Sequence, residues 1–164
     1  DLAAATIIGV EGAAAFENLI RSPQLEELAD KDQQASLLAG LAISGVDYVR
    51  AMRVRATAAS EAVRTFERFD ALIAPTLLHG APPVDKPLSV GSVGMGGNGG
   101  PTNLLGWPSI SIPMGPDENG LPLGLELIGA PYEEMTLLAL AMAFQRETDW
   151  HMRQPSARVP VRRS

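Results

Sequence analysis

The chain has 164 residues, of which 46% are apolar and 20% are charged, and its formal net charge at pH 7 is −6. This apolar content excludes a disordered chain, and the length suffices for one domain with a hydrophobic core. The acidic balance, without a concentrated basic patch, excludes nucleic acid as an expected direct partner. The chain has no cysteine, which excludes disulfides, thiolate metal sites and a cysteine nucleophile.

No apolar run reaches the roughly 18 residues that a membrane span needs. The first residues, DLAAATIIGVEG, also lack the basic start of a signal peptide. We therefore expect a soluble, cytoplasmic protein without a membrane partner.

The first seventy residues have the patterns of helices. Small and apolar residues dominate from Thr6 to Ile20, and the pair Ser22-Pro23 predicts a stop and restart. A second helix is expected from about Asp32 to Ile43, ending at Gly45. The clearest periodicity follows, with apolar residues at steps of three and four: Val49, Met52, Ala56, Ala59, Val63 and Phe66. This pattern predicts an amphipathic helix on a core, and a coiled coil is the alternative, although the pattern covers fewer than three heptads.

The second half has the sequence patterns of strands and loops. Residues 70–76, DALIAPT, predict a short buried strand that Pro75 closes. From Leu78 to Pro101 the chain is rich in Gly and Pro and has no periodicity, which is typical of a functional or disordered loop.

Two further strands, SISIP (109–113) and LGLELIG (123–129), flank an Asn119-Gly120 turn signal. In the second strand Leu123, Leu125 and Leu127 form an apolar face. The opposite face is mixed and carries Glu126, which we expect to be exposed at an edge or hydrogen-bonded.

A final helix is expected from about Glu134 to Glu147. Its core-facing residues are predicted to be Leu137, Leu138, Ala141 and Phe144. Residues 155–164 form a basic tail that we expect to be loosely held.

Strands interleaved with helices predict an α/β layer architecture. Three strands make a poor free-standing sheet, because further strands or a covering layer must bury its faces and edges. We therefore expect residues 1–154 to be part of a larger sheet domain.

Four stretches occur in a distinctive order: FDALIAPT, a Gly/Pro-rich loop, PTNLLGWPSISIPMG and GLPLGLELIG. Together with the following Leu- and Ala-rich helix, they resemble the C-terminal portion of the amidase-signature hydrolases. The resemblance runs from about Glu11 to Thr148. It implies the C-terminal part of a mixed β-sheet flanked by helices, within a single amidase domain.

The resemblance also implies a chemistry. Members of this family hydrolyse amides with a nucleophilic serine, which a second serine in a cis peptide and a lysine activate, while backbone amides stabilise the oxyanion. The family carries these residues in its N-terminal half. This chain has no adjacent pair of serines, so no catalytic residue is transferred to it, and the N-terminal half of the same domain becomes the expected partner.

Local chemistry in the loop offers two alternatives. Lys86 precedes Ser89 and Ser92, which could form a serine-lysine dyad, whereas an exposed loop lysine is the ordinary case. The string GMGGNG, residues 94–99, satisfies a dinucleotide fingerprint but lacks the strand before it and the helix of normal length after it. A backbone-rich wall of a substrate pocket is the preferred interpretation.

The resemblance places substrate specificity near the strand end after APT and in the loop before PTN. Trp107 could stack on a substrate, or it could simply pack between Gly106 and Pro108. No cofactor and no metal site is expected, since neither His79 nor His151 has a partner at ligand spacing. The candidate substrate-binding residues are Thr76, His79, Asn98, Gly99 and Trp107.

Three hypotheses follow. The preferred one is an amidase whose catalytic half lies outside this chain and whose substrate is a small-molecule amide. A small molecule is favoured because glycines stand where the tRNA-dependent members of the family show an acidic residue and a threonine. The others are a catalytically inert binding or assembly module of the same fold, and a nucleotide-binding domain. The sequence also allows a homodimer.

Overall fold

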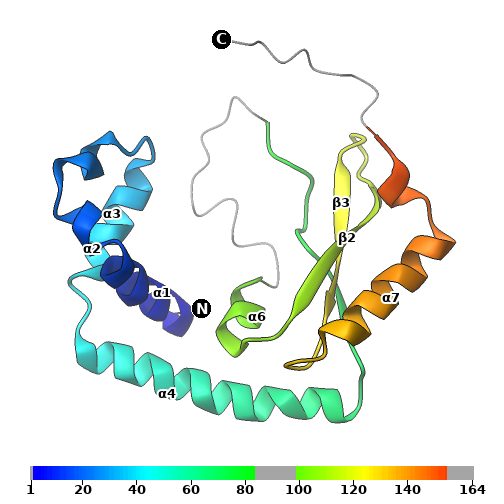
Figure 1. Ribbon diagram of the computed structural model, residues 1–164, viewed down its shortest axis with the longest axis horizontal. Helices are drawn as coiled ribbons and strands as arrows, with labels where there is room; N and C mark the ends of the chain where they lie inside the picture. The colour runs from blue at the N-terminus through cyan, green and yellow to red at the C-terminus, as the bar shows by residue number, and fades with distance from the viewer. Residues whose placement is uncertain (1, 84–98, 155–164) are drawn as a thin grey trace.

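The computed structural model describes residues 2–83 and 99–154. Figure 1 shows a long helix, α4, that runs from a helical cluster to a small sheet. The helical part consists of α1 (Leu2–Ala15), α2 (Glu17–Ile20), the 3₁₀ helix η1 (Pro23–Glu27), α3 (Lys31–Gly40), α4 (Gly45–Ala62) and η2 (Val63–Glu67). The remainder consists of β1 (Leu72–Pro75), α6 (Gly99–Leu105), β2 (Ser109–Pro116), β3 (Pro122–Ile128), α7 (Glu134–Glu147) and η3 (Trp150–Met152).

The first two predicted helices exist with altered bounds. The helix expected from Thr6 to Ile20 is divided at Phe16, whose φ of −104° and ψ of 19° leave the helical region. The second helix begins one residue before the expected Asp32 and ends at Gly40. It begins there because the Asp30 carboxylate accepts hydrogen bonds from two backbone N–H groups of the first turn, at 2.9 and 3.1 Å.

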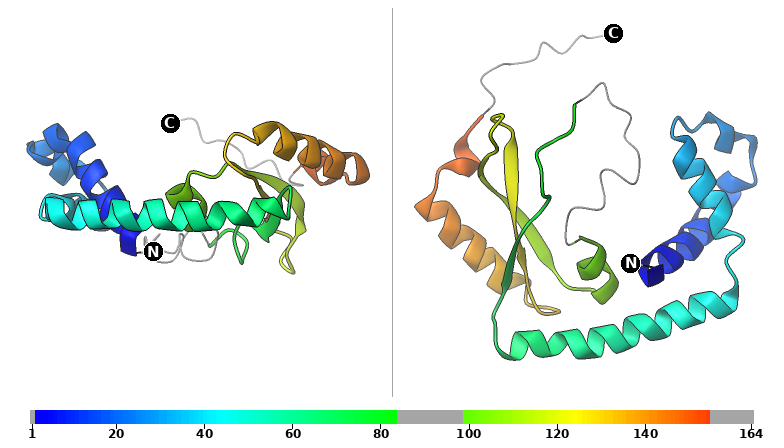
Figure 2. Two further views of the ribbon diagram at one scale, coloured as in Figure 1. Left: turned by 90° about the horizontal axis from the view of Figure 1, so that it is seen from below. Right: turned by 180° about the vertical axis from the view of Figure 1, so that it is seen from behind.

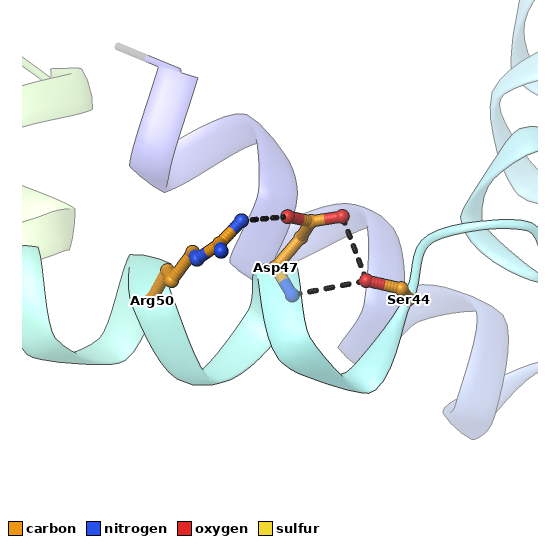
Figure 3. Close-up of polar contacts among 3 residues, drawn as sticks. All are labelled: Ser44, Asp47 and Arg50. Atoms are coloured by element: carbon orange, nitrogen blue, oxygen red, sulfur yellow. Dashed lines mark hydrogen bonds and ion pairs between the residues drawn. The ribbon is translucent and has the colours of Figure 1, made fainter.

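A reciprocal cap fixes the start of α4. Ser44 Oγ accepts a hydrogen bond from the Asp47 backbone N–H at 3.1 Å and donates one to Asp47 Oδ2 at 2.7 Å (Figure 3). Arg50 Nη1 lies 3.3 Å from the other carboxylate oxygen of Asp47. These contacts satisfy an N–H group that helix geometry leaves without a partner.

The predicted amphipathic helix is confirmed as α4, and it packs against α1 and α6. The expected core stripe is only partly covered: Met52, Ala59 and Phe66 are half-buried, whereas Val49, Ala56 and Val63 are exposed. The buried residue of the helix, Ala51, lies outside the expected stripe. The difference arises because α1 and α6 cover only part of the α4 surface.

The three strands form an antiparallel sheet in the order β1-β3-β2. The predicted hairpin is confirmed, with Gly120 at a φ of 81° in its turn. The Asp117 carboxylate stabilises this turn by accepting hydrogen bonds from the backbone N–H groups of Asn119 and Leu121, both at 2.8 Å. Strand β2 is longer than the expected SISIP, because a bulge between Pro113 and Gly115 lets pairing continue beyond it.

Helix α7 covers one face of the sheet (Figure 2). The apolar face predicted for the second hairpin strand is confirmed, since Leu125 and Leu127 pack toward this helix. Leu138 was expected to face the core, but it is 45% exposed, because it lies about 100° around the helix from the buried Leu137. The buried cluster consists of Ile112, Leu127, Leu137 and Ala141, flanked by Ala71, Ile110, Leu125 and Phe144.

A second, smaller cluster holds the helical part together through Ala13, Ile20 and Leu25. Within residues 2–83 and 99–154, no large side chain falls below 2% exposure. The fold is therefore an α/β arrangement of two thin cores joined by α4, in agreement with the predicted class.

In the described part of the chain, no single helix has the length and apolarity of a membrane span. Helix α3 and the continuous stretch of α4 and η2 reach that threshold only together, and a bend of 99° separates them.

Candidate functional site

The sheet face opposite α7 carries polar residues around Glu126, beside the apolar pair Leu72 and Ile128. Ser111 of β2 and Ala74 of β1 both pair with Glu126 of the central strand β3, so these three side chains share that face. Thr76, two residues beyond Ala74, turns toward the same face, and its Oγ1 lies 2.6 Å from Ser111 Oγ. Residues from all three strands thus meet at one polar surface, which we call the polar face: Thr76, Ser111, Gly124 and Glu126.

Gly124 lets the hydroxyl pair form across the central strand. A Cβ atom at this position would lie 2.6 Å from both Thr76 Oγ1 and Ser111 Oγ, closer than real Cβ atoms approach other atoms. The Gly124 carbonyl also accepts a hydrogen bond from the Thr76 backbone N–H at 2.8 Å, which continues the ladder past the end of β1. The sequence placed Thr76 correctly after a strand end, and it did not reveal Ser111 or Gly124 as its neighbours.

Glu126 is buried, with 5% of its surface exposed. The expectation that it lies at an edge is wrong, because β3 is the middle strand of the three. The expectation that it is hydrogen-bonded fails for one oxygen, since Oε2 is enclosed and has no hydrogen-bond partner. The alternation of Leu123, Leu125 and Leu127 with the residues between them assigned Glu126 to the opposite face of the strand. It did not show what covers that face.

Helix α6 begins at Gly99, one of the predicted site residues, and was not expected from the sequence. Its end is a Schellman motif: the Trp107 N–H donates to the Thr102 carbonyl at 3.0 Å, and the Gly106 N–H donates to the Asn103 carbonyl at 3.4 Å. Gly106 adopts the positive φ of 71° that this motif requires. The sequence signal was the glycine followed two residues later by a proline, which is typical of a helix end.

Trp107 packs within this chain. Its ring meets that of Phe66 edge to face, with centroids 4.8 Å apart and planes 74° apart. The ring is half-buried, and the following residue, Pro108, accepts a hydrogen bond from the Gly129 N–H at 3.0 Å. Of the two roles considered for Trp107, packing is the one with an observed contact.

The remaining predicted site residues lie apart. His79 is exposed, and its Nδ1 lies 2.9 Å from the Gly80 carbonyl oxygen. Ser109 and Leu72 both pair with Ile128 of β3. Trp107, two residues before Ser109, therefore lies near the start of β1, whereas Thr76 lies beyond the end of β1. Asn98, the Lys86 dyad and the glycine run up to residue 98 lie outside the described residues.

A hollow of about 280 Å³ lies between α1, α4 and α6. At its rim the Arg55 Nε donates to the Leu104 carbonyl at 2.7 Å, tying α4 to the end of α6. Beside it Tyr48 donates a hydrogen bond to Glu11 Oε1 at 2.9 Å, and this bond raises the pKa of the Tyr48 hydroxyl. The hollow is lined by Ala4, Ile7, Ile8, Glu11, Met52, Arg55, Gly100, Asn103 and Leu104.

The described residues contain no group of three histidine, aspartate or glutamate side chains that could hold a metal ion. The chemistry that these residues offer is hydrogen bonding: two hydroxyls, a carboxylate and the backbone of the α6 start. This chemistry suits binding and orientation of a polar group.

Comparison with known proteins gives the family context. The family model described as Amidase matches residues 3–138. A glutamyl-tRNA(Gln) amidotransferase subunit from Thermosynechococcus vestitus is 39% identical over 112 residues, which cover 66% of this chain and 23% of that protein. A fatty acid amide hydrolase from Medicago truncatula is 34% identical over 131 residues, covering 76% of this chain and 22% of that protein. The chain thus spans less than a quarter of the length of these curated relatives.

Solved structures have the same fold. A structure described as the crystal structure of an amidase superposes with a TM-score of 0.73 at 28% identity, covering 87% of this chain and 34% of that one. An inhibitor-bound complex, described as a vestigial protein complex that reveals the origins of an s-triazine catabolic enzyme, gives a TM-score of 0.80 at 25% identity. That match covers 93% of this chain and 35% of the other.

Proposed function

We propose a function for this chain from its family: it belongs to the amidase family. The proposal is that the chain is the C-terminal segment of an enzyme that hydrolyses the carbon-nitrogen bond of a small-molecule amide. The observation that carries the proposal is the family match over residues 3–138. The matched relatives include amidotransferase subunits and an amide hydrolase, and amide-bond chemistry is common to both names.

The proposed mechanism uses a Ser-cisSer-Lys arrangement in an N-terminal half that precedes this segment in the complete enzyme. A neutral lysine takes a proton through the bridging serine, and the nucleophilic serine attacks the amide carbonyl. Backbone N–H groups stabilise the oxyanion, the amine leaves with a proton, and water then hydrolyses the acyl-enzyme. In support of this division, the present sequence has no adjacent pair of serines.

The proposed role of this segment is to provide scaffold and part of the substrate pocket. We assign substrate contacts to Thr76, His79, Asn98, Gly99 and Trp107. The hydroxyl of Thr76 on the polar face and the exposed ring of His79 offer hydrogen-bonding groups. The glycines before and within the start of α6 favour a small-molecule amide, because they leave space and backbone groups where larger side chains would stand.

The proposed partners are the N-terminal half of the same domain and the amide substrate. A second copy of the chain, forming a homodimer, is a further candidate partner. Nucleic acid and a membrane are not among the expected partners. A cytoplasmic location stays a prediction from the sequence.

The second candidate is a catalytically inert binding or assembly module of the same fold. It remains a candidate because the nucleophile of the first candidate is assigned to a part of the protein outside residues 1–164. The two candidates differ in whether the complete protein contains a reactive serine.

The test is amide hydrolysis by the complete protein, with residues 1–164 alone as the comparison. We expect the complete protein to release aniline from simple anilides and ammonia from benzamides, and a fluorophosphonate probe to label a serine outside residues 1–164. Substitution of His79 by Ala is expected to change KM more than kcat. If the complete protein bound amides but neither hydrolysed them nor reacted with the probe, the inert module would be the better account of its function.

A further inference from the structure

The polar face contains an acceptor that the described residues do not satisfy. Glu126 has only 5% of its surface exposed, and its Oε2 has no hydrogen-bond partner. Two hydroxyls on this face, those of Thr76 and Ser111, lie 2.6 Å apart and are hydrogen-bonded to each other. A buried carboxylate without a donor is strongly unfavourable, so a complete fold is expected to supply one.

Several basic side chains within the described residues make contacts away from Glu126. Arg55 donates to the end of α6, and Arg50 and Arg153 pair with aspartates on their own helices or turns. Arg21 pairs with Glu17 on the surface of α2. No ion pair in residues 2–83 and 99–154 involves Glu126, and its Oε2 accepts no hydrogen bond from these residues.

The sheet is open beside Glu126, where its cross-strand neighbour Ser111 of β2 is exposed. Helix α7 covers only the opposite face, and β1 and β2 are both edge strands in the order β1-β3-β2. The structures that match 87% and 93% of this chain are matched over only 34% and 35% of their own length. About two thirds of each of those folds therefore lies outside the matched region.

We propose that a lysine or arginine side chain from the remaining part of the amidase domain docks on the polar face and donates to the Glu126 carboxylate. This inference rests on the proposed function, which places that part in the same enzyme. Charge complementarity selects the occupant, since an ionised carboxylate only accepts hydrogen bonds and a buried one is best balanced by a cation. Glu126 thereby joins the two parts of the domain from the centre of the sheet.

The enclosure of Glu126 distinguishes a built-in cation from a substrate amine. A substrate must enter and leave in every turnover, which requires an open path to its binding group. Glu126 is 5% exposed, whereas the predicted pocket residue His79 is exposed and Thr76 and Trp107 are half-buried. The cation is therefore expected to be buried when the two parts of the domain fold together.

The test compares two carboxylate-to-amide substitutions in the complete enzyme. Glu126→Gln preserves size and removes the charge, and we expect it to lower the midpoint of thermal unfolding by about 2 °C or more. Glu118→Gln removes the same charge from the exposed hairpin turn and is the matched control, expected to shift the midpoint by less than about 1 °C.

Two results would overturn the proposal. An unchanged or higher midpoint for Glu126→Gln would show that the carboxylate has no cationic partner. A raised KM with an unchanged midpoint would assign Glu126 to the substrate instead. A structure of the complete enzyme is expected to place a basic nitrogen within about 4 Å of the carboxylate. Amide hydrolysis is measured separately, so loss of the proposed function and loss of this contact are distinguishable.

Discussion

At the level of single residues, Gly124 controls the close approach of the three strands at the polar face. A side chain here would collide with the hydroxyls of Thr76 and Ser111, whose mutual distance is 2.6 Å. We predict that Gly124→Ala destabilises the complete protein by about 1–3 kcal/mol, because the strands must separate or the hydroxyl pair must break. Chemical denaturation monitored by circular dichroism measures this change.

Gly12→Ala is the matched control for Gly124→Ala. Gly12 lies inside α1, and a Cβ atom there would meet nothing within 4 Å. We expect this substitution to stabilise the protein by up to about 1 kcal/mol, because alanine favours helices over glycine. Equal stability of the two variants would mean that the strands at Gly124 are not packed as described.

The sequence predicted single residues unevenly. Thr76 could be placed after a strand end because Pro75 marks that end, whereas its bond to Ser111 depends on register across β3. Glu126 was assigned to the mixed face of its strand, but its burial depends on the order of the strands in the sheet. Strand order is a long-range property that local patterns do not encode.

At the level of elements, the start of α4 depends on the Ser44 cap. Replacing Ser44 by Ala removes the acceptor for the Asp47 N–H and the partner of its carboxylate. We predict a loss of about 1 kcal/mol in the free energy of unfolding. Ser60→Ala is the control, because Ser60 lies within the same helix and only donates to the Thr57 carbonyl. A loss for Ser60→Ala as large as that for Ser44→Ala would disprove the role of the cap.

The Tyr48-Glu11 hydrogen bond joins α4 to α1 and gives a pH-dependent prediction. The bond to Glu11 raises the pKa of the Tyr48 hydroxyl above its ordinary value of 10.0. A group with a raised pKa in the folded state stabilises the fold fully below its unfolded pKa, and this contribution is lost as pH rises through the folded pKa. We predict that wild type unfolds at a higher temperature than Tyr48→Phe at pH 8, and that this difference shrinks above pH 10.

Thermal unfolding of both proteins between pH 8 and pH 11 measures this difference. A gap between wild type and Tyr48→Phe that widens above pH 10 would contradict the donor role of the hydroxyl.

Elements with strong local patterns were predicted well. Helices α4 and α7 follow from apolar spacing, and the β2-β3 hairpin follows from alternation around Asn119-Gly120. Helix α6 was missed because its seven residues, GGPTNLL, begin with two glycines and a proline and are too few for a periodic pattern. Gly106 followed by Pro108 is a recognisable sign of a helix end. Such a sign does not show that a helix precedes it.

At the level of the whole molecule, the apolar surface beside β1 indicates an incomplete domain. Phe69 and Leu140 are exposed around a hollow of about 610 Å³, and Ile73 of the edge strand is 70% exposed there. We predict that residues 1–164 alone bind a hydrophobic dye and unfold without a cooperative transition, because this surface lacks its cover. The complete protein is the control and is expected to unfold cooperatively. A sharp transition and monomeric behaviour of residues 1–164 would count against an incomplete domain.

The central claim is that these residues are one part of an amidase whose nucleophile lies elsewhere in the enzyme. The most direct measurement is the intact mass, under denaturing conditions, of the protein purified from its native source. We predict either one polypeptide well above 17.3 kDa or a second polypeptide beside this one, in each case carrying an adjacent pair of serines. A preparation that contains only a 17.3 kDa polypeptide would contradict the serine mechanism and leave the inert module as the function.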